Sequence, residues 1–519
     1  MPQASQSDKG AGGPDKPSIR TFEGTRSRLA LISSPWPFFD RPSVQLGTLK
    51  GFLNQGLPDT GVDTYHLYLQ IAERLGYDLY HRISSRLWVA ECPYAALLYP
   101  ERMDTVRRLW GRKTRGDADL SSVDFDRLCR DIRRTSRSLL SGTAWEEYDL
   151  IGFSICLAQL SSSLYFIREI KRRAPYIPIV VGGSACAGNM GNSLLQGIPD
   201  IDYVIQGEGE IPLLGLMRFI RGGGDAFSRS RPFMENGSGK RPQFSEGPHA
   251  CEARLNIPGL MSRNALTGKA KVQQIKDLDE LPIPDYGDYF RDLKSLDPDR
   301  RFLPRLPMEI SRGCWWRKSS RKTDEKGCAF CNLNLQWEGY RRKSTERVIS
   351  EIDALVTRHQ VLTISFMDNL LPARGLEALF SGISDLKKDL KLFSEIRADT
   401  SHEVLRQMAT AGMREVQVGV EALSTRLLKK LNKGTTAMDN LEIMKQGERA
   451  DMPDLTGNLI LAFPSSDAED VAETLTHVSA GYEYNCRDIS SLAESSPILG
   501  ALHLLRCHLL LPHGDSRYL

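Results

Sequence analysis

The chain of 519 residues is predicted to form an α/β fold with two successive domains. Short runs rich in Val, Ile and Leu alternate with amphipathic segments in two separate series, as parallel strands joined by helices do. A stretch rich in Gly, Ser, Pro and charged residues separates the two series, and a hydrophobic fraction of 41% supplies two cores. We therefore expect a disordered start (1–27), a doubly wound Rossmann-like domain (28–222), a connection (223–301), a partial (β/α)6 barrel (302–480) and an atypical tail (481–519).

The first series places its strands in five apolar runs. These runs are residues 29–33, 61–69, 150–155, 177–181 and 203–205. Between the third and fourth, residues 161–173 predict a helix, because Leu164, Ile167 and Ile170 recur at helical spacing with basic residues opposite. Strands without polar alternation are typical of a parallel sheet covered by helices on both faces.

The connection of residues 223–301 is expected to contain little regular structure. It is centred on the turn-rich stretch GSGKRPQFSEGP. Its later part, residues 257–290, mixes turn signals with apolar residues. Because a free linker would be less apolar, we expect this part to be fixed against both domains.

The second series begins after Leu306 with five strand-like segments that end in polar residues. The segments are PMEISRG, VLTISFMDN, LFSEIRAD, EVQVGVEA and GNLILAFP. In β/α barrels the loops after the strands form the active face. The polar ends of these strands are therefore the predicted place of the chemistry.

Ten cysteines in a chain without a secretion signal do not predict a disulfide framework. Seven of them lie far apart in the sequence, and Cys156 and Cys186 stand in apolar stretches. We interpret these two as small core residues in preference to ligands.

Cys314, Cys328 and Cys331 form the exception, with thirteen residues and then two residues between them. Soft thiolates select zinc or iron–sulfur clusters, and zinc would require a fourth ligand nearby. The nearest histidine, His359, stands in a helix-like segment. A cluster held by three cysteines, with one iron open to substrate, fits this count better than zinc; three unrelated thiols are the alternative.

Residues 305–478 resemble the radical S-adenosylmethionine (SAM) superfamily. In that family three cysteines after the first barrel strand hold a [4Fe-4S] cluster, with the usual spacing of three and then two residues. The insert WWRKSSRKTDEKG departs from that spacing without removing a ligand. The beginning Gly313-Cys314-Trp315-Trp316 and the ending CAFCNLN resemble the cobalamin-dependent branch that matures ribosomal peptides.

The same resemblance implies SAM-binding residues at later strand ends. FMDN with Asp368, SEIRAD with Glu395 and Arg397, and VGVE with Glu421 match the ends of strands two to four. Carboxylates and Arg there can grip the ribose, amino and carboxylate groups of SAM. Each residue taken alone is equally well an ordinary surface charge.

The first domain resembles the cobalamin-binding fold of the same branch at three strand ends. The residues that carry this resemblance are Ser154, Gly182, Gly183, Ser184, Gly207 and Glu208. Glycines there would let the backbone approach a ligand, although tight strand-to-helix turns need them as well. No Asp-x-His-x-x-Gly sequence supplies a histidine below the cobalt; Gln159 is a candidate for that face or simply a polar residue starting a helix.

The resemblance implies a cobalamin-dependent radical SAM enzyme that methylates unactivated carbon in a ribosomal precursor peptide. Its partners would be that peptide and an electron donor of the flavodoxin or ferredoxin type. The alternatives are a radical epimerase, rearranging enzyme or thioether former, and a catalytically impaired homologue that binds peptide. The insert residues Trp315, Trp316, Arg317 and Lys318 either touch substrate or cover the cluster.

Composition argues against two other classes of partner. A net charge of +3 does not predict nucleic-acid binding, and without an apolar run of membrane length or a signal peptide we expect a cytoplasmic protein without membrane contact. The basic residues 130–137 are interpreted as a solvated helix face in preference to a peptide site.

The tail departs from the pattern of the resembling family. No sixth strand is evident after residue 481, where an apolar helix-like stretch at 498–511 is followed by the end of the chain. A natural variant, a truncation and a frameshift are all compatible with this sequence. An open barrel edge beside an apolar tail would predict aggregation or a covering partner.

Overall fold

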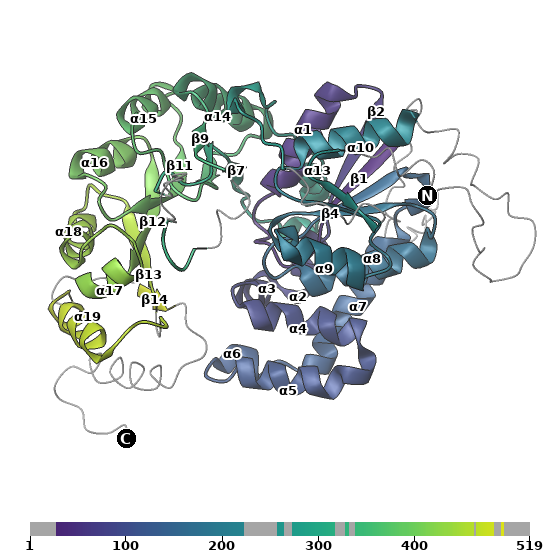
Figure 1. The fold of residues 1–519 in the computed structure, drawn as a ribbon, viewed down its shortest axis with the longest axis horizontal. Helices are drawn as coiled ribbons and strands as arrows, with labels where there is room; N and C mark the ends of the chain where they lie inside the picture. Colours follow the sequence, from purple (N-terminus) through teal and green to yellow (C-terminus); the bar gives the residue numbers. More distant parts are fainter. Residues whose placement is uncertain are drawn as a thin grey trace, which may run out of the picture.

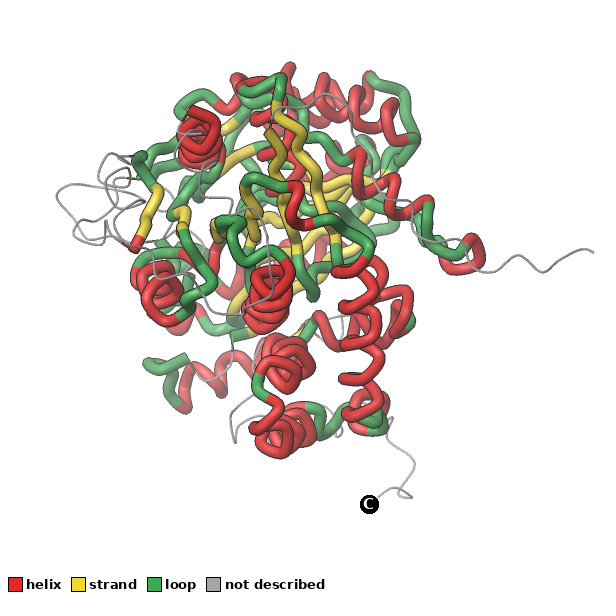
Figure 2. Tube along the Cα trace, turned by 90° about the vertical axis from the view of Figure 1, so that its right-hand side faces the viewer, coloured by secondary structure: helices red, strands yellow, loops and turns green. Residues whose placement is uncertain are grey.

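The computed structural model describes residues 27–222, 257–263, 272–316, 327–331, 338–460, 463–481 and 489–491. The chain forms two α/β domains that lie side by side, each around its own sheet (Figure 1). Viewed at 90° to this direction, the strands run through the interior and helices surround them (Figure 2). The α/β class predicted from the sequence is confirmed.

The first sheet has the strand order β2-β1-β3-β4-β5-β6. Its strands are β1 (Ser27–Ser33), β2 (Thr60–His66), β3 (Leu150–Ser154), β4 (Ile179–Gly182), β5 (Tyr203–Ile205) and β6 (Leu260–Ser262). The first five are parallel and each lies within or overlaps a predicted run, whereas β6 pairs antiparallel with β5. β2 stops at His66, earlier than predicted, because helix α2 begins at Tyr68.

Helices cover both faces of this sheet, as a doubly wound fold requires. Leu29 and Leu31 pack in one core with the helices α1 and α10, whereas Ala30 and Ile32 pack in the opposite core with α8. The covering helices are α1 (Val44–Gly56), α8 (Leu160–Arg173), α9 (Asn189–Gly197) and α10 (Glu210–Gly222). Alternate residues of β1 are therefore buried on opposite faces.

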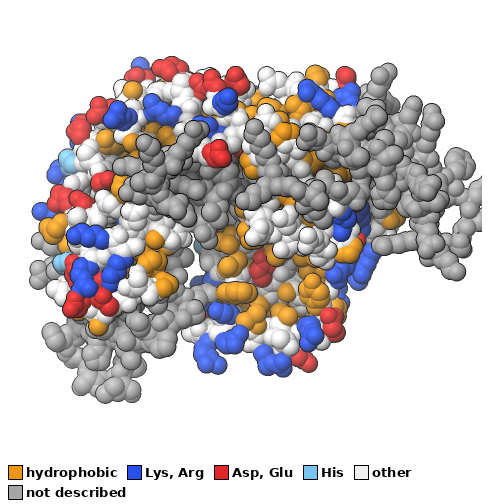
Figure 3. Space-filling model, viewed as in Figure 1, with side chains coloured by type: hydrophobic (Ala, Val, Ile, Leu, Met, Phe, Trp, Pro, Cys, Tyr) orange, Lys and Arg blue, Asp and Glu red, His pale blue; other side chains and the backbone are white. Residues whose placement is uncertain are grey.

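A helical insertion separates β2 from β3 and forms the lower part of the domain in Figure 1. It comprises α2 (Tyr68–Leu75), α3 (Tyr77–Ser84), α4 (Leu87–Leu98), η1 (Pro100–Arg102), α5 (Met103–Lys113), α6 (Ala118–Ser121), α7 (Phe125–Ser141) and η2 (Trp145–Glu147). On α7, Phe125 and Ile132 are buried while Arg130, Arg134 and Arg137 are exposed. The basic stretch is thus a solvated helix face. Further Lys and Arg side chains gather over α5 and α6 (Figure 3).

The second sheet is all parallel, with the order β14-β13-β12-β11-β10-β7. Its strands are β7 (Leu306–Met308), β10 (Thr363–Phe366), β11 (Lys391–Arg397), β12 (Met413–Glu421), β13 (Asp454–Leu459) and β14 (Ile489–Ser491). Its helices are α14 (Thr345–His359), α15 (Leu376–Asp385), α16 (His402–Thr410), α17 (Thr425–Lys430), α18 (Ala437–Gly447) and α19 (Ala468–Gly481). None of the helices in the described part of the chain is long and apolar enough to cross a bilayer.

The expectation that the sixth strand is missing was wrong. β14 pairs with β13 through Gly457↔Ile489 and the two positions that follow. With only three residues it has no apolar run of its own, so the pairing is visible only in the folded chain. The apolar stretch at 498–511 lies outside the described residues.

The connection contains more regular structure than expected. Besides β6 it forms η5 (Leu278–Glu280), α13 (Gly287–Lys294) and η6 (Pro298–Arg300). The connection is hydrogen-bonded to the second domain: the carboxylate of Asp279 accepts from the amide of Ser344 (2.8 Å), and Arg347 donates to the carbonyl of Leu281 (2.6 Å). This segment therefore contacts the second domain directly, as its apolar residues predicted.

Asp288 of α13 fastens the connection to the first domain. Its buried carboxylate accepts hydrogen bonds from Lys50 Nζ (2.7 Å) and from the amide (2.7 Å) and hydroxyl (3.1 Å) of Thr64. Burial alone would raise the pKa of Asp288, but the Lys50 charge and these hydrogen bonds lower it to about 2. The ionised form is therefore the one that the fold stabilises.

We predict that Asp288→Asn lowers the free energy of unfolding by about 3 kcal/mol at neutral pH, because Lys50 loses its buried partner. Since the pKa of Asp288 is depressed on folding, this contribution is complete above about pH 4 and fades as the pH falls toward 2. Urea unfolding of both proteins as a function of pH measures the difference.

The matched control is Asp285→Asn, which removes a carboxylate that is partly exposed and 3.9 Å from the same ammonium. It should cost less than about 1 kcal/mol. Equal losses for the two variants would show that the buried pair has no special part in docking the connection.

Candidate functional site

The loop that bears the first cysteine leaves the second sheet after β7. It forms β8 (Ser311–Arg312), which pairs antiparallel with β9 (Arg341–Arg342), and then reaches Cys314. Gly313 has φ +88°, and a Cβ there would lie 2.2 Å from the carbonyl oxygen of Gly339. Only glycine lets the two backbones approach this closely.

Both ends of the thirteen-residue insert are attached to one turn, residues 431–434, between α17 and α18. At its start, Trp316 donates from Nε1 to the carbonyl of Asn432 (2.9 Å). At its end, Ala329 donates from its amide to the carbonyl of Leu431 (2.8 Å), and Asn432 Nδ2 donates to the carbonyl of Gly327 (3.1 Å). This turn, here called the insert clamp (431–434), brings Cys314 and Cys328 together across a long insert.

Gly434 completes the insert clamp. Its φ is +74°, and a Cβ at this position would lie 2.1 Å from the indole ring of Trp316. The indole therefore packs directly on the backbone of Gly434, which no other residue permits without displacing the ring.

The three thiols are close enough to influence one another. Burial raises the pKa of Cys328; the positive charges of Lys433 and Arg397 lower it, and Cys331 and Cys314 raise it again. All three cysteines are half-buried. Within the described residues, no three His, Cys, Asp or Glu side chains are gathered tightly enough to hold a metal ion.

The donor set nevertheless fits an iron–sulfur cluster. Soft sulfur ligands meet on neighbouring loops, and the two cations that act on Cys328 can offset the negative charge of a thiolate-ligated cluster. Cys314, Cys328 and Cys331 would hold it, as predicted.

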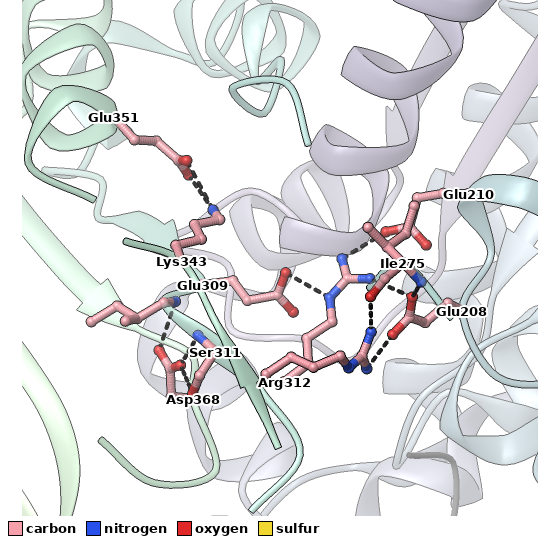
Figure 4. A network of polar contacts seen from close by, with 11 residues as sticks. Glu208, Glu210, Ile275, Glu309, Ser311, Arg312, Lys343, Glu351 and Asp368 are labelled. Carbon is pink, nitrogen blue, oxygen red and sulfur yellow. Dashed lines mark hydrogen bonds and ion pairs between the residues drawn. The ribbon is translucent and has the colours of Figure 1, made fainter. Parts of the chain in front are cut away.

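Asp368, predicted to bind cofactor, has a different part in the structure. Its buried carboxylate accepts from the amide of Ile310 (3.1 Å) and the hydroxyl of Ser311 (2.6 Å), and also from the amide of Ser311 (Figure 4). Burial raises the pKa of Asp368 to about 7 against these bonds. Both oxygens are used to hold the turn from β7 to β8, so Asp368 positions the cysteine loop.

Arg397 is also committed within the protein. The buried guanidinium donates to the carbonyl of Lys433 (2.7 Å) and lies over the rings of Trp316 and Trp315, at 4.3 and 5.6 Å from their centroids. Trp315 Nε1 in turn donates to the carbonyl of Leu371 (3.0 Å). The two tryptophans thus cover Arg397 at the base of the insert, a contact within the protein that differs from both predicted parts, substrate contact and covering the cluster. Arg317 and Lys318 lie outside the described residues.

Glu395 and Glu421 stand near the ends of the neighbouring strands β11 and β12, as expected. Lys433 Nζ lies 2.9 Å from Glu421 Oε1, whereas no described residue donates a hydrogen bond to the carboxylate of Glu395. Burial, and next the charge of Glu421, raise the pKa of Glu395 to about 7, while Lys433 lowers it. A carboxylate in this position fits a cationic or hydroxyl-bearing ligand such as SAM.

The described residues also form a cavity of about 300 Å³ at the carboxyl edge of the first sheet. It is lined by six predicted residues, Ser154, Gly182, Gly183, Ser184, Gly207 and Glu208. Apolar side chains from α1 and the strands line much of the rest, and Met367 and Asn369 of the second domain also reach it. The cavity therefore lies between the domains, at the place where ligands of doubly wound sheets bind.

Two glycines of this edge are required by close contacts. A Cβ on Gly183, at φ +98°, would lie 2.5 Å from the carbonyl oxygen of Ile155. A Cβ on Gly207, at φ +80°, would lie 2.4 Å from Val272 Cγ1. Tight packing explains both glycines, and it also leaves bare backbone beside the cavity.

Gln159 does not line the cavity, which corrects its assignment to the lower cobalt face. Its buried amide donates to Ser33 Oγ (3.2 Å) and to the carbonyl of Ser34 (2.5 Å) and accepts from the amide of Cys156 (2.9 Å). Both ends of the amide thus hold the loops after β1 and β3. Cys186 is a buried core residue as expected, but Cys156 is half-buried and lines the cavity.

A group of charged residues between the domains was not predicted from the sequence. Arg312 lies within hydrogen-bonding distance of Glu210 (2.6 Å) and Glu309 (2.9 Å), and its guanidinium is 3.2 Å from Glu208 (Figure 4). Arg341 is 2.5 Å from Glu208. The available signal was an arginine two residues before Cys314 and an unusual Gly-Glu-Gly-Glu sequence at a strand end, but neither indicates the other as its partner.

Residues 308–478 match the model of the Radical SAM superfamily. The chain is 24% identical over 336 residues to an uncharacterised methyltransferase of Pyrococcus horikoshii, covering 63% of each protein. It is 22% identical over 366 residues to an anaerobic magnesium-protoporphyrin IX monomethyl ester cyclase of Cereibacter sphaeroides, covering 65% of this chain and 48% of the cyclase. The chain thus spans between about half and two thirds of these relatives' lengths.

Two solved structures share the fold at 15% identity. The cobalamin-dependent SAM radical enzyme OxsB, with aqua-cobalamin and SAM bound, matches 87% of this chain and 51% of its own, with a TM-score of 0.56. The radical SAM methyltransferase TsrM of Kitasatospora setae matches 88% of this chain and 71% of its own, with a TM-score of 0.52. The chain therefore contains a radical SAM domain, which implies a [4Fe-4S] cluster and SAM, behind a Rossmann-like domain.

We predict that Gly434→Ala accelerates the loss of iron from the reconstituted protein to a chelator by about tenfold. An alanine at positive φ costs on the order of 1 kcal/mol, and its Cβ would also displace Trp316 from the insert clamp. The control is Gly116→Ala, which has φ +90° with nothing within 4 Å of the new Cβ. The same rate of iron loss in both variants would show that the insert clamp does not retain the cluster.

We also predict that Glu395→Gln has a higher free energy of unfolding than the wild type in the cluster-free chain, by an amount that grows as the pH rises from about 4.5 to 7. In the folded protein the pKa of Glu395 is raised from 4.5 to about 7. Between these two values the carboxyl ionises in the unfolded chain before it ionises in the folded protein, and this favours unfolding of the wild type. Urea unfolding at pH 5 and pH 8 should give a difference between variant and wild type that grows toward pH 8. The exposed residue Glu377 supplies the control, Glu377→Gln. A difference independent of pH would contradict the shifted pKa.

Proposed function

We propose that this protein is a cobalamin-dependent radical SAM methyltransferase. One observation carries the proposal: the cavity at the carboxyl edge of the first sheet is walled by both domains and includes Arg312, two residues before Cys314. A cofactor in this cavity would lie close to the cysteine loop, as transfer of a group between two cofactors requires.

When bound, the cluster with SAM would supply a 5′-deoxyadenosyl radical and cobalamin would supply a methyl group. The residues of the chain bind and orient these groups. Gly182 and Gly183 leave backbone open beside the cavity, and the hydroxyl groups of Ser154 and Ser184 line it. The apolar side chains of Leu46 and other residues in the wall limit access of water.

The second domain orients SAM through groups near the ends of β11 and β12. The carboxylate of Glu395 is half-buried and accepts no hydrogen bond from a described residue, so it can accept one from the ribose or amino group of SAM. Lys433, whose Nζ lies 2.9 Å from Glu421 Oε1, adds a positive charge that also acts on Cys328. Together these groups would bind SAM beside the cysteine loop.

We propose a ribosomal precursor peptide as the substrate and carbon methylation as the reaction. The support is the likeness of GCWW and CAFCNLN to the peptide-maturing branch and the name of the Pyrococcus relative as a methyltransferase. A small electron-transfer protein of the flavodoxin or ferredoxin type would reduce the cluster, and the cytoplasm is the compartment that suits such a partner.

A radical reaction without methyl transfer is the second candidate, and the similarity to a cyclase favours it. In that case the peptide product would be epimerised or rearranged without gaining mass. A non-catalytic homologue that only binds peptide would show no iron–sulfur absorption after reconstitution.

Anaerobic reconstitution with iron, sulfide and hydroxocobalamin tests the proposal. We expect about four iron atoms per chain and bound cobalamin. After addition of SAM, a reductant and the precursor peptide, we expect a product heavier by one CH2, because a methyl group replaces a hydrogen. Cys328→Ser should lower the iron content, whereas Cys156→Ser should leave it unchanged because Cys156 lies in the first domain. Cluster without cobalamin would favour the second candidate, and protein with neither group would contradict both.

A further inference from the structure

A cluster of five charged residues joins the two domains beside the cavity. We call it the Arg312 junction, and it consists of Glu208, Glu210, Glu309, Arg312 and Arg341. Glu208 and Glu210 come from the loop after β5 and the start of α10, whereas Glu309, Arg312 and Arg341 come from the second domain (Figure 4). The junction therefore crosses the domain boundary.

Three of the five side chains of the junction are almost completely buried. The side chains of Arg312, Glu208 and Glu210 are 5%, 2% and 5% exposed. Glu208 also accepts from the amide of Ile275 (2.7 Å), so the connection is tied to the same carboxylate. Because buried charges require their partners, displacing one of these groups forces the others to rearrange.

One side of the junction faces the cavity. Glu208, Glu210, Glu309 and Arg312 all line it. A ligand that fills the cavity would therefore lie against residues that hold the guanidinium of Arg312.

The other side of the junction adjoins Cys314, the first predicted cluster ligand. Arg312 is followed by Gly313, whose backbone is packed against Gly339, and then by Cys314. β8 and β9 pair Arg312 with Arg341, so both guanidiniums of the hairpin are held by Glu208. Only Arg312 and Gly313 thus stand between the carboxylates and Cys314, the first predicted cluster ligand.

We propose that Arg312 is a positioning residue that links occupancy of the cavity to the binding of SAM at the cluster. The inference rests on the proposed function, because it takes the cavity ligand to be cobalamin. A ligand that orders Glu208 and Glu210 also orders Arg312 and the loop of Cys314. SAM then binds to a loop that is already ordered, and its affinity rises.

Thermodynamic linkage makes this inference measurable in both directions. If cobalamin tightens SAM binding by some factor, SAM must tighten cobalamin binding by the same factor. The experiment uses the full chain with its cluster reconstituted and oxidised, so that no turnover occurs. Radiolabelled SAM binding is measured with and without hydroxocobalamin, and hydroxocobalamin binding is measured with and without SAM.

For the wild-type protein we expect each cofactor to tighten the other by about fivefold or more. Arg312→Gln should reduce this factor to nearly one, because the guanidinium that joins the two sites is gone. Glu210→Gln, which preserves shape and removes one charge, should reduce it as well. Glu210→Gln also serves as the test if Arg312→Gln does not fold.

Lys343→Gln together with Glu351→Gln is the matched control. This pair is also buried, with Nζ 2.8 Å from the carboxylate, but both residues belong to the second domain and neither lines the cavity. The control should keep the wild-type coupling even if it lowers stability. A purely structural role of the Arg312 junction would instead weaken both affinities and leave the coupling factor unchanged.

Three outcomes would overturn the inference. They are independent binding of the two cofactors in the wild type, wild-type coupling in Arg312→Gln or Glu210→Gln, and loss of coupling in the control. Failure of the wild-type protein to bind hydroxocobalamin is a separate result, which would overturn the proposed function together with the linkage.

Discussion

Burial of the Arg312 guanidinium is the constraint on which the arrangement of the two sheets depends. An arginine that is 5% exposed must be surrounded by acceptors, and here the first domain supplies two carboxylates and the second supplies one. The carboxyl edge of the first sheet is thereby held against the cysteine loop of the second. The cavity and the cluster loop share a wall because this charge has to be satisfied by both domains.

The cysteine loop shows a second consequence of tertiary contacts. In the usual spacing of the resembling family, a short segment keeps the first two cysteines together, whereas here thirteen residues separate them. The insert clamp replaces that covalent restraint by binding both ends of the insert, with Trp316 at one end and Gly327 at the other. A long insert is tolerated because loop-closure entropy rises only slowly with length and two anchoring contacts offset it.

Two carboxyl groups near the cysteine loop have similar pKa values but different roles. The pKa values of Asp368 and Glu395 are both raised to about 7, primarily by burial. Both carboxylate oxygens of Asp368 accept hydrogen bonds, from Ile310 and Ser311, so Asp368 fixes the backbone of the turn from β7 to β8. Glu395 receives no hydrogen bond from the described residues and faces the charge of Glu421, so it is available to a ligand. The same functional group thus fixes backbone in one place and receives no hydrogen bond from the described residues in the other.

Local sequence determined the elements of this protein and was enough to predict three cysteines as its metal ligands. Apolar runs and helical periodicity are properties of neighbouring residues, so β1, β3, β4, β5 and α8 could be predicted, as could the cysteine set and the glycines of the cavity. Tertiary structure decided what depends on partners far apart in the chain: the antiparallel strand β6, the short strand β14, and the use of Gln159, Asp368 and Arg397 inside the protein. The pairing of Arg312 with Glu208 and Glu210 belongs to this second group. About a hundred residues separate these charges, and their attraction acts only once folding has removed water from between them.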